Sequence, residues 1–347
     1  MQYKSLDLDS ISLQFKLPPS KILITGGLGF IFSHVAEWFA ARGHEVHVMD
    51  NCSDGSNPRL IGKFIDDGMI IQKCNINDIF EYLSVYNKTD DFNYDYVIHA
   101  AAESNVDKSI DDCMPFYESN IHGTITVLNW CRQLQERFNC IKQILYINTD
   151  EVYGNVEHAA DITAPLMPSS PYAASKASAG CIANSYRVTY GLPIKEFRMC
   201  NIIGKRQADT KLIPKAIKYM REGMDFPVYG NGSARREYMD VRLIGLIIEH
   251  FWMLDKNKPD VEFNFTGKKS SADEYIHNIT MRESRSIADV LKAINGMFGK
   301  TVSVTEGKRP GHDHRYAMIP ADWLHVLPKI FFLDTLRWIA SVSDNDV

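Results

Sequence analysis

The stretch Lys21-Ile-Leu-Ile-Thr-Gly-Gly-Leu-Gly-Phe-Ile-Phe-Ser-His34 decides the fold class. An apolar run leads into a glycine-rich turn, and an amphipathic helical pattern follows it. Gly26 and Gly29 match the first two positions of a G-x-x-G-x-x-G motif, and Phe32 occupies the third. A strand that turns into a helix through glycines is typical of a phosphate-binding loop, because glycine lets backbone N–H groups approach a phosphate closely.

A carboxylate follows this loop at the spacing that a dinucleotide site requires. Residues 45–50 (EVHVMD) form a second apolar run that ends in Asp50. An acidic side chain about 20 residues after the loop accepts hydrogen bonds from the adenosine ribose and repels a 2′-phosphate, so we expect NAD rather than NADP. The alternative is a glycine turn in an α/β protein that binds no dinucleotide.

Phe32 stands where a glycine usually allows close packing of the helix on the strand. Because that glycine does not itself contact the phosphate, we expect the phenyl ring to be accommodated by local repacking. Cofactor binding damaged by the ring is the alternative.

Apolar runs and helical patterns alternate through the first half of the chain. Further strand candidates are residues 68–74, 94–102, 142–149 and 192–200, and the segments between the earlier runs carry apolar residues at three-to-four spacing. This alternation predicts right-handed βαβ units. The predicted fold class is therefore α/β, a doubly wound, mostly parallel Rossmann-type sheet with a smaller C-terminal substrate-binding lobe.

The same pattern suggests how the chain is divided. Residues 1–20 are expected to be an N-terminal extension that ends at Pro18-Pro19. Residues 21–204 are expected to form the NAD-binding domain and to carry the catalytic residues. The alternation of apolar runs and helical segments becomes irregular after about residue 205. Residues 205–347 are therefore expected to form mainly the substrate-binding lobe, interleaved with the first domain.

Composition limits the classes of partner. The 347 residues carry a net charge of −5, with 45% apolar and 23% charged residues, which argues against binding to nucleic acid or to an anionic membrane. No apolar run approaches the ~20 residues of a membrane span. The N-terminus is too polar for a secretory signal. The seven cysteines are odd in number and form no C-x-x-C pair, which predicts reduced thiols in a cytoplasmic protein without a metal site.

Tyr172 and Lys176 lie four residues apart in a predicted helix, one above the other on the same face. A lysine in that place can lower the pKa of the tyrosine, so that the phenolate serves as a base. The pair alone is a weak signal, and an exposed helix with incidental Tyr and Lys is the alternative. It gains weight because it follows the strand end at Asn148-Thr149 in the right order after a nucleotide loop.

Taken together, the motifs resemble one family. TGGLGF, Asp50, HAAAESNVDKSI, TDEVYG, YAASK, RMCNIIGKRQ, KLIP, PVYGNGSARREYMDV and RPGHDHRYA occur in the order found in extended short-chain dehydrogenase/reductases. Within them the chain resembles the nucleotide-diphosphate-glucose 4,6-dehydratases over about residues 21–317. The resemblance implies a homodimer that uses NAD and converts a nucleotide-diphosphate hexose, dTDP-glucose or UDP-glucose, to the 4-keto-6-deoxy sugar. It also implies that helices near 115–135 and 172–190 pair into a four-helix interface.

The adjacent Asp150-Glu151 pair is the discriminating feature, because relatives that epimerise or decarboxylate nucleotide sugars usually lack it. The resemblance implies that Tyr172, assisted by Lys176, takes the O4 proton during oxidation at C4, while Thr149 hydrogen-bonds the C4 oxygen. The ketone acidifies the C5 hydrogen, which Glu151 can remove. A protonated Asp150 can donate to the departing C6 hydroxyl. The two carboxyl roles could also be exchanged.

The resemblance implies binding residues as well. Besides Tyr172 and Lys176, the cofactor-binding positions are Gly26, Gly29, Phe30, Ile31, Asp50, Asn51, Asn75, Ile76, Ala100, Ala101 and Ala102. The substrate-binding positions are Ser104, Asn201, Lys211, Leu212, Pro227, Tyr229, Arg236, Arg309 and His312. The two arginines suit a diphosphate because they are always charged and donate from a fixed fork.

The chain departs from the family pattern at several places besides Phe32. Asn148 replaces a common serine that lies beside the nicotinamide, and Asn75 replaces an aspartate that contacts adenine. Residues 267–284 are longer than the equivalent stretch, in which Asn278 is a candidate for an asparagine near the base and diphosphate. The C-terminal tail is short.

Two other functions stay open at this point. One is a dehydratase of another nucleotide sugar, such as an N-acetylhexosamine. The other is a catalytically silent scaffold that binds nucleotides. The scaffold is disfavoured because all five catalytic residues are intact, and a protein without catalytic activity has no physical need for all of them. These residues are Thr149, Asp150, Glu151, Tyr172 and Lys176.

Overall fold

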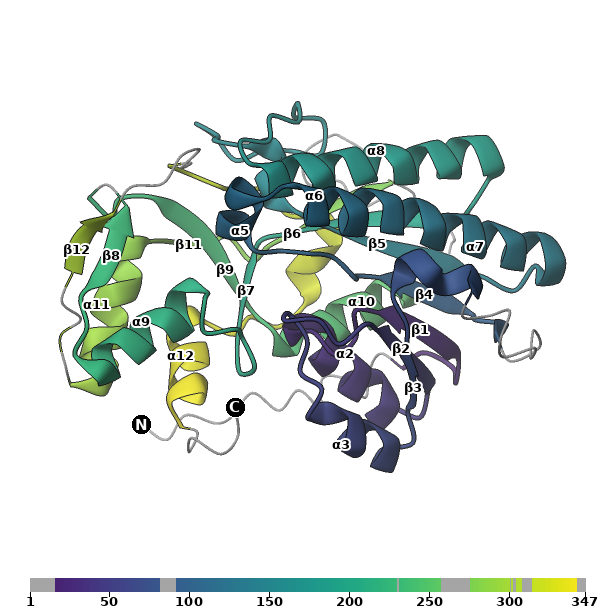
Figure 1. Ribbon diagram of the computed structural model, residues 1–347, viewed down its shortest axis with the longest axis horizontal. Coiled ribbons are helices and arrows are strands. Elements are labelled where there is room, and N and C mark those ends of the chain that lie inside the picture. Colours follow the sequence, from purple (N-terminus) through teal and green to yellow (C-terminus); the bar gives the residue numbers. More distant parts are fainter. Residues whose placement is uncertain are drawn as a thin grey trace.

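The computed structural model describes residues 16–81, 92–229, 231–256, 275–299, 301, 304–307 and 314–341. A seven-stranded sheet in the order β10-β6-β5-β4-β1-β2-β3 forms its centre, and each neighbouring pair is parallel (Figure 1). This confirms the predicted α/β class. The strands are β1 (Lys21–Thr25), β2 (Glu45–Asp50), β3 (Ile70–Lys73), β4 (Tyr96–His99), β5 (Gln143–Thr149), β6 (Ile194–Met199) and β10 (Ile276–Ile279).

Helices cover both faces of this sheet (Figure 1). In β1, Ile22 and Ile24 belong to one buried cluster and Leu23 to another, because successive strand residues point to opposite faces. The first cluster lies under α2 (Phe30–Ala41), α3 (Leu60–Asp66) and α10 (Arg242–Lys256), and the second under α7 (Gly123–Phe138) and α8 (Pro171–Tyr190). The carboxyl edge of the sheet stays clear of both layers.

A smaller lobe with its own buried cluster lies beside this sheet (Figure 1). Its two small sheets have the orders β11-β9-β7 and β12-β8. Its elements are β7 (Asn201–Ile203), α9 (Leu212–Glu222), β8 (Phe226–Tyr229), β9 (Arg235–Asp240), β11 (Glu283–Ser286), α11 (Ile287–Phe298), β12 (Val304–Gly307) and α12 (Phe332–Ala340).

The chain crosses between the two parts more than once. Although they come late in the sequence, β10 pairs with β6 and α10 packs against α2. At the start of the described chain, the Leu17 amide donates to the Glu249 carboxylate of α10 at 3.0 Å. Residues after 204 therefore build part of the large sheet layer as well as the smaller lobe.

Short helices shape the connections near the carboxyl edge. Ser170 caps α8 by accepting a hydrogen bond from the Ala173 amide at 3.1 Å, and Pro171 occupies the first turn, as expected at a helix start. The remaining short elements are η1 (Ile76–Asp78), α5 (Val106–Asp111), α6 (Met114–Phe116), η3 (Tyr117–His122), η4 (Asp150–Tyr153) and η5 (Asp322–Val326).

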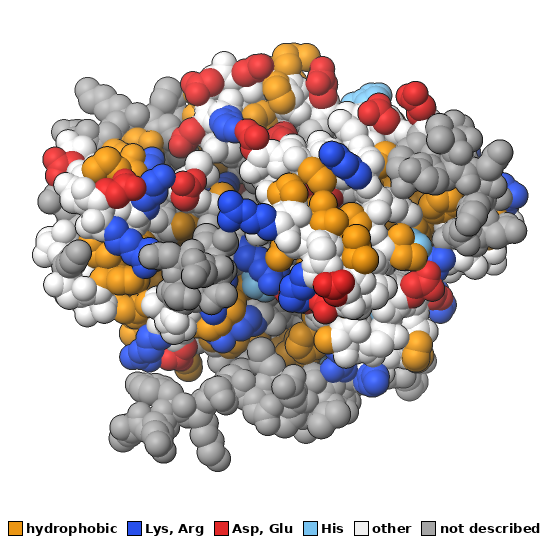
Figure 2. All heavy atoms as spheres, turned by 60° about the horizontal axis from the view of Figure 1, so that its bottom comes forward, with side chains coloured by type: hydrophobic (Ala, Val, Ile, Leu, Met, Phe, Trp, Pro, Cys, Tyr) orange, Lys and Arg blue, Asp and Glu red, His pale blue; other side chains and the backbone are white. Residues whose placement is uncertain are grey.

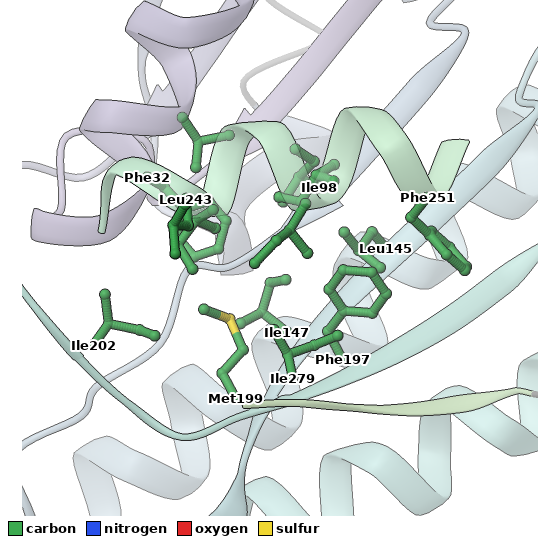
Figure 3. Packing of buried hydrophobic residues seen from close by; sticks show 14 of the residues in the cluster. Phe32, Ile98, Leu145, Ile147, Phe197, Met199, Ile202, Leu243, Phe251 and Ile279 are labelled. Atoms are coloured by element: carbon green, nitrogen blue, oxygen red, sulfur yellow. The ribbon is translucent and has the colours of Figure 1, made fainter. Parts of the chain in front are cut away.

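Phe32 packs into the core at the start of α2, and it also lines the cavity beside the glycine loop. Its side chain is buried in the cluster between α2, α10 and the sheet, where Figure 3 also shows Leu243, Met199 and Ile202. Small residues on α10 compensate for the large residues on α2: a Cβ added to Gly245 would lie 2.4 Å from Cγ of Trp38. The first helix therefore keeps its place by close approach to α10, as the expected repacking requires.

The surface shows no extended charged stripe on the face drawn in Figure 2, where basic and acidic side chains are interspersed. Among the described residues, no helix is long and apolar enough to cross a membrane. All seven cysteines are free thiols.

Candidate active site

The glycine loop leaves room for a phosphate at the start of α2. Gly26 has a φ of +71°, and a Cβ added to it would lie 2.7 Å from Cα of Ala101, so only glycine fits there. Gly29 precedes α2 directly, and a Cβ on it would lie 3.1 Å from the Gly26 carbonyl oxygen. The N-terminus of α2 therefore offers backbone donors and the positive end of its dipole to an anion.

This loop forms one wall of a cavity of about 550 Å³ at the carboxyl edge of the sheet. The cavity extends from the end of β2, past the end of β4, to the end of β5 and the start of α8. It brings together every predicted cofactor and catalytic residue: Gly26, Gly29, Phe30, Ile31, Asp50, Asn51, Asn75, Ile76, Ala100, Ala101, Ala102, Thr149, Asp150, Glu151, Tyr172 and Lys176.

A second cavity of about 230 Å³ lies between this edge and the smaller lobe. The two cavities share Glu151, Asn201 and Lys211 among their lining residues, so they adjoin at the catalytic loop. Of the predicted substrate residues, Ser104 lines the larger cavity, whereas Leu212, Pro227, Tyr229 and Arg236 line the smaller one. Arg309 and His312 lie outside the described residues.

Asp50 holds the glycine loop in shape. Its buried carboxylate accepts hydrogen bonds from the Leu28 amide at 3.0 Å, the Cys52 amide at 2.8 Å and the Ser56 hydroxyl at 2.5 Å. A carboxylate has about four acceptor positions, so one stays available for a ribose hydroxyl. The contacts with Leu28 and Ser56 could not be read from the sequence, because they depend on how the loop folds back over β2.

The catalytic loop begins where β5 ends. Thr149 accepts a hydrogen bond from the Glu151 amide at 3.3 Å and so caps the turn η4. The same hydroxyl donates to Oδ1 of Asp150 at 3.3 Å and lies within hydrogen-bonding reach of the Tyr172 phenol. One threonine therefore ties the turn that carries both carboxyl groups to the helix that carries the tyrosine.

Asp150 and Glu151 differ in their surroundings. Asp150 is 3% exposed, and its Oδ2 has no hydrogen-bond partner among the described residues. Burial, together with the neighbouring Glu151, raises the pKa of Asp150 to about 8. Asp150 is therefore largely protonated at neutral pH and can donate a proton. Glu151 is half-buried and lines both cavities, where it can accept one.

Burial dominates the electrostatics of both Tyr172 and Lys176. Desolvation and the nearby Glu151 raise the pKa of Tyr172 above its ordinary value. The buried Lys176 ammonium donates to the Ile147 carbonyl at 2.6 Å, and burial lowers its own pKa to about 7. With a pKa near 7, Lys176 is partly charged at neutral pH, and its expected effect on the Tyr172 pKa stays a prediction.

Two further side chains point to a polar ligand in the smaller cavity. The buried Tyr238 hydroxyl and the Asn201 Nδ2 atom both lack a hydrogen-bond partner among the described residues, and both side chains line the cavity. Buried polar groups of this kind are usually satisfied by a ligand or water. Tyr238 was missed because a tyrosine in a strand normally indicates core packing.

Arg236 is backed by an aromatic ring. Its guanidinium lies 4.0 Å from the ring centroid of Tyr316, which also lines the smaller cavity. Stacking of this kind holds an arginine in a fixed orientation. Tyr316 is the last residue of the RPGHDHRY stretch, in which the sequence indicated Arg309 and His312 instead.

Two of the asparagines that depart from the family pattern make hydrogen bonds within the fold. Asn75 lines the larger cavity, but its side chain accepts from the Asn77 amide at 3.0 Å and caps η1. Asn278 is fully buried in β10 and lines neither cavity described here. Its Nδ2 donates to the carbonyls of Ala160 and Ile319, at 3.1 Å each, so it joins segments of the core.

Comparison with known proteins identifies the family. The model of the NAD dependent epimerase/dehydratase family matches residues 22–264. The chain belongs to this family. It is 31% identical over 309 residues to a probable dTDP-glucose 4,6-dehydratase of Sinorhizobium fredii, a match that covers 86% of this chain and 84% of the relative. It is also 31% identical over 327 residues to the dTDP-glucose 4,6-dehydratase of Salmonella typhimurium, with the same coverage.

Solved structures of this family extend the comparison. The dTDP-glucose 4,6-dehydratase of Streptomyces venezuelae, determined with NAD bound, shares 28% identity with this chain at a TM-score of 0.74. The match covers 92% of this chain and 96% of that one.

The cavity fits the NAD that gives the family its name. The glycine cradle at Gly26 and Gly29 suits a pyrophosphate, and Asp50 keeps an acceptor for the adenosine ribose. Lys176 and Tyr172 stand at the opposite end of the same cavity. Among the described residues, no group of His, Cys, Asp and Glu side chains could hold a metal ion.

Proposed function

We propose that this protein catalyses the 4,6-dehydration of a nucleotide-diphosphate-glucose, either dTDP-glucose or UDP-glucose. The observation that carries the proposal is the unequal environment of Asp150 and Glu151, which provides a proton donor beside a proton acceptor on one turn. Gly26, Gly29 and Asp50 would hold NAD, which would supply the hydride acceptor for C4 and the hydride donor for C6 that the side chains lack. Dehydratase relatives of similar length support the assignment.

The catalytic side chains divide the proton transfers among them. Tyr172 takes the proton of the O4 hydroxyl, and the Thr149 hydroxyl hydrogen-bonds the C4 oxygen as its charge changes. Glu151 then removes the C5 proton that the C4 ketone has made acidic. Asp150 donates its proton to O6, so that the C6 hydroxyl leaves as water and a C5–C6 double bond forms. After hydride reaches C6, a proton returns to C5, and one water has been lost overall.

The smaller cavity holds the nucleotide end of the substrate. Lys211 donates to the Ser104 carbonyl at 2.9 Å, and its ammonium lies where the two cavities adjoin. With Arg236 it places positive charge beside a diphosphate, and the free Asn201 Nδ2 and Tyr238 hydroxyl add hydrogen-bond donors. The aromatic and aliphatic walls at Phe226, Pro227 and Tyr229 suit the base.

The direct test is turnover on a panel of glucose nucleotides carrying dTDP, UDP, GDP or CDP, with UDP-N-acetylglucosamine included. Mass spectrometry of the product should show the loss of one water from the dTDP or the UDP substrate. Loss of water from the N-acetylhexosamine nucleotide alone would favour the alternative function, dehydration of another nucleotide sugar. No turnover on any of them, with no NAD bound after purification, would favour the silent scaffold.

We also propose that the protein works as a homodimer. Helices α7 and α8 pack side by side over one face of the sheet, and Val188 and Tyr190 near the end of α8 are 66% and 51% exposed. Apolar side chains left exposed on a pair of packed helices suit contact with a second copy of the same helices. Light scattering at micromolar concentration should give twice the mass of one chain, and the mass of a single chain would exclude the dimer.

A cytoplasmic location is proposed on the state of the cysteines. All seven are free, and their thiols lie in different parts of the fold, as expected where thiols stay reduced. Fractionation of the producing cells tests this location.

A further inference from the structure

A buried ion pair lies directly behind the catalytic loop. Glu196 on β6 is 1% exposed, and its Oε1 accepts hydrogen bonds from Nε of Arg198 at 2.7 Å and from Nδ2 of Asn148 at 2.8 Å. Burying a carboxylate and a guanidinium costs several kcal/mol of desolvation each, and such a pair often adds nothing to stability. Its place behind the active site therefore calls for another explanation.

Asn148 connects Glu196 to the residue that begins the catalytic loop. The Asn148 Oδ1 atom accepts a hydrogen bond from the Thr149 amide at 2.9 Å. Its Nδ2 atom, besides donating to Glu196, lies 3.4 Å from the Lys176 carbonyl on α8. One side chain thus contacts the end of β5, the buried carboxylate and the catalytic helix.

Arg198 secures the other end of the same loop. Its Nη1 donates to the Tyr153 hydroxyl at 2.8 Å, and that hydroxyl donates to Oδ1 of Asn278 at 2.8 Å. The segment from Thr149 to Tyr153 is therefore held at both ends by groups that are themselves bonded to Glu196. Asp150 and Glu151 lie between these two attachment points.

Helix α8 is seated against the same carboxylate. A Cβ added to Gly180 would lie 3.0 Å from Nδ2 of Asn148 and 3.1 Å from Oε2 of Glu196, so the glycine allows this close contact. Four residues earlier, the same helix carries Lys176. The height of the helix over the sheet therefore depends on Glu196 and Asn148.

We propose that Glu196 is a positioning residue, which acts through Asn148 to fix Thr149 relative to the helix that carries Tyr172 and Lys176. The proposal rests on the dehydratase function given above. It assigns Asn148, which stands where the family commonly has serine, a structural link to a carboxylate across the neighbouring strand.

The carboxylate also acts on the charge of Lys176. The titratable groups that act on this ammonium are Tyr146 on β5, His99 on β4 and Glu196 on β6. Burial keeps Tyr146 and His99 neutral by raising the pKa of the first and lowering that of the second to about 3. Of these three groups Glu196 is the one that raises the Lys176 pKa, against the stronger lowering by burial.

The first test compares two buried carboxylates. Glu196→Gln keeps the shape and the acceptor for Asn148 but removes the charge. Glu249→Gln is the matched control, because Glu249 is fully buried, pairs with Arg42 at 2.6 Å and lines neither cavity. Without the Glu196 charge the Lys176 pKa falls below about 7, and because Lys176 then loses its proton before Asp150 does, the alkaline limb of kcat should move to lower pH by about one unit in Glu196→Gln. An unmoved limb, or an equal shift in the control, would overturn the electrostatic part of the proposal.

The second test breaks the hydrogen-bond link and leaves the ion pair in place, and it also serves if Glu196→Gln folds poorly. Asn148→Ala should speed amide hydrogen exchange at Thr149 at least tenfold. It should lower kcat about tenfold or more with KM changed less than threefold, whereas Glu249→Gln changes neither property. Unchanged exchange and kcat in Asn148→Ala would overturn the positioning role.

The exchange measurement needs no turnover, so it tests the positioning role separately from the proposed dehydratase function. If wild-type protein dehydrates none of the sugars, the proposed function fails. Fast exchange at Thr149 in Asn148→Ala then still supports the link, and slow exchange excludes it.

Discussion

Asp150 and Glu151 are consecutive in the chain, yet Asp150 is 3% exposed and lacks a partner for Oδ2, whereas Glu151 reaches both cavities. The turn η4 produces this difference, because it directs one side chain into the core and the next one toward the substrate. Two identical functional groups thereby acquire different environments, which suits the opposite roles proposed for them, as in other enzymes that separate an acid from a base by environment.

Replacing both carboxyl groups should stop elimination without stopping the first oxidation. In Asp150→Asn with Glu151→Gln, Tyr172 and Thr149 stay in place, so the absorbance of reduced nicotinamide should build up on mixing with substrate while product falls about 10²- to 10⁴-fold. Rapid-mixing spectroscopy and product mass analysis measure the two effects. Product formation at the wild-type rate would contradict both assigned roles.

The single substitution Asp150→Asn should stabilise the fold at neutral pH. The pKa of Asp150 is about 8 in the folded protein and lies near its ordinary value of 3.8 in the unfolded chain. The folded state therefore binds the extra proton between these values, and stability from this group falls as pH rises from about 4 to about 8. We expect Asn to raise the free energy of unfolding by roughly 1–3 kcal/mol at pH 8.

Chemical denaturation at pH 4 and pH 8 measures this effect, and the difference between variant and wild type should nearly vanish at pH 4. Equal differences at the two pH values would mean that Asp150 is not protonated in the folded protein at neutral pH.

Tyr172→Phe should block the reaction before any reduced nicotinamide forms. The phenol is the group that takes the O4 proton, so turnover should fall about 10²- to 10⁴-fold while substrate affinity stays near wild type. Tyr190→Phe, in the exposed last turn of the same helix, is the control and should leave turnover unchanged. A reduced-nicotinamide signal of wild-type size in Tyr172→Phe would rule out its role as base.

Phe32→Gly should weaken the fold more than the cofactor site. Phe32 is 6% exposed in the cluster between α2 and α10, so removing its ring leaves a cavity and costs roughly 3–5 kcal/mol of unfolding free energy. NAD retention is expected to persist: Phe32 also lines the larger cavity, but the contacts proposed for NAD belong to Gly26, Gly29 and Asp50. Phe39→Gly removes a buried ring from the same helix at a position that does not line the cavity, and is the matched control. A loss of NAD in Phe32→Gly alone would show that the ring supports the cofactor site.

Much of the fold could be predicted because its signals are local. The runs at 21–25 and 45–50 coincide with β1 and β2, and residues 142–149 contain β5, since buried parallel strands are short and continuously apolar. The end of the sheet at β10 was not predicted, because a four-residue strand after a long irregular stretch carries little pattern of its own. Its place beside β6 is set by pairing between segments far apart in the chain.

In the candidate site, too, some features follow from the local sequence and others from contacts between distant segments. The sequence by itself determined which groups the site contains: a glycine loop, an acidic residue after β2, an Asp-Glu pair, and a Tyr and Lys four residues apart. The tertiary structure decided how these groups behave. Burial makes Asp150 an acid, and the Ile147 carbonyl and the buried surroundings restrain Lys176. Glu196, which no local motif marked, lies against Asn148 because strands β5 and β6 pair in parallel. Protonation and orientation depend on desolvation and on partners distant in the chain, and a linear pattern contains neither.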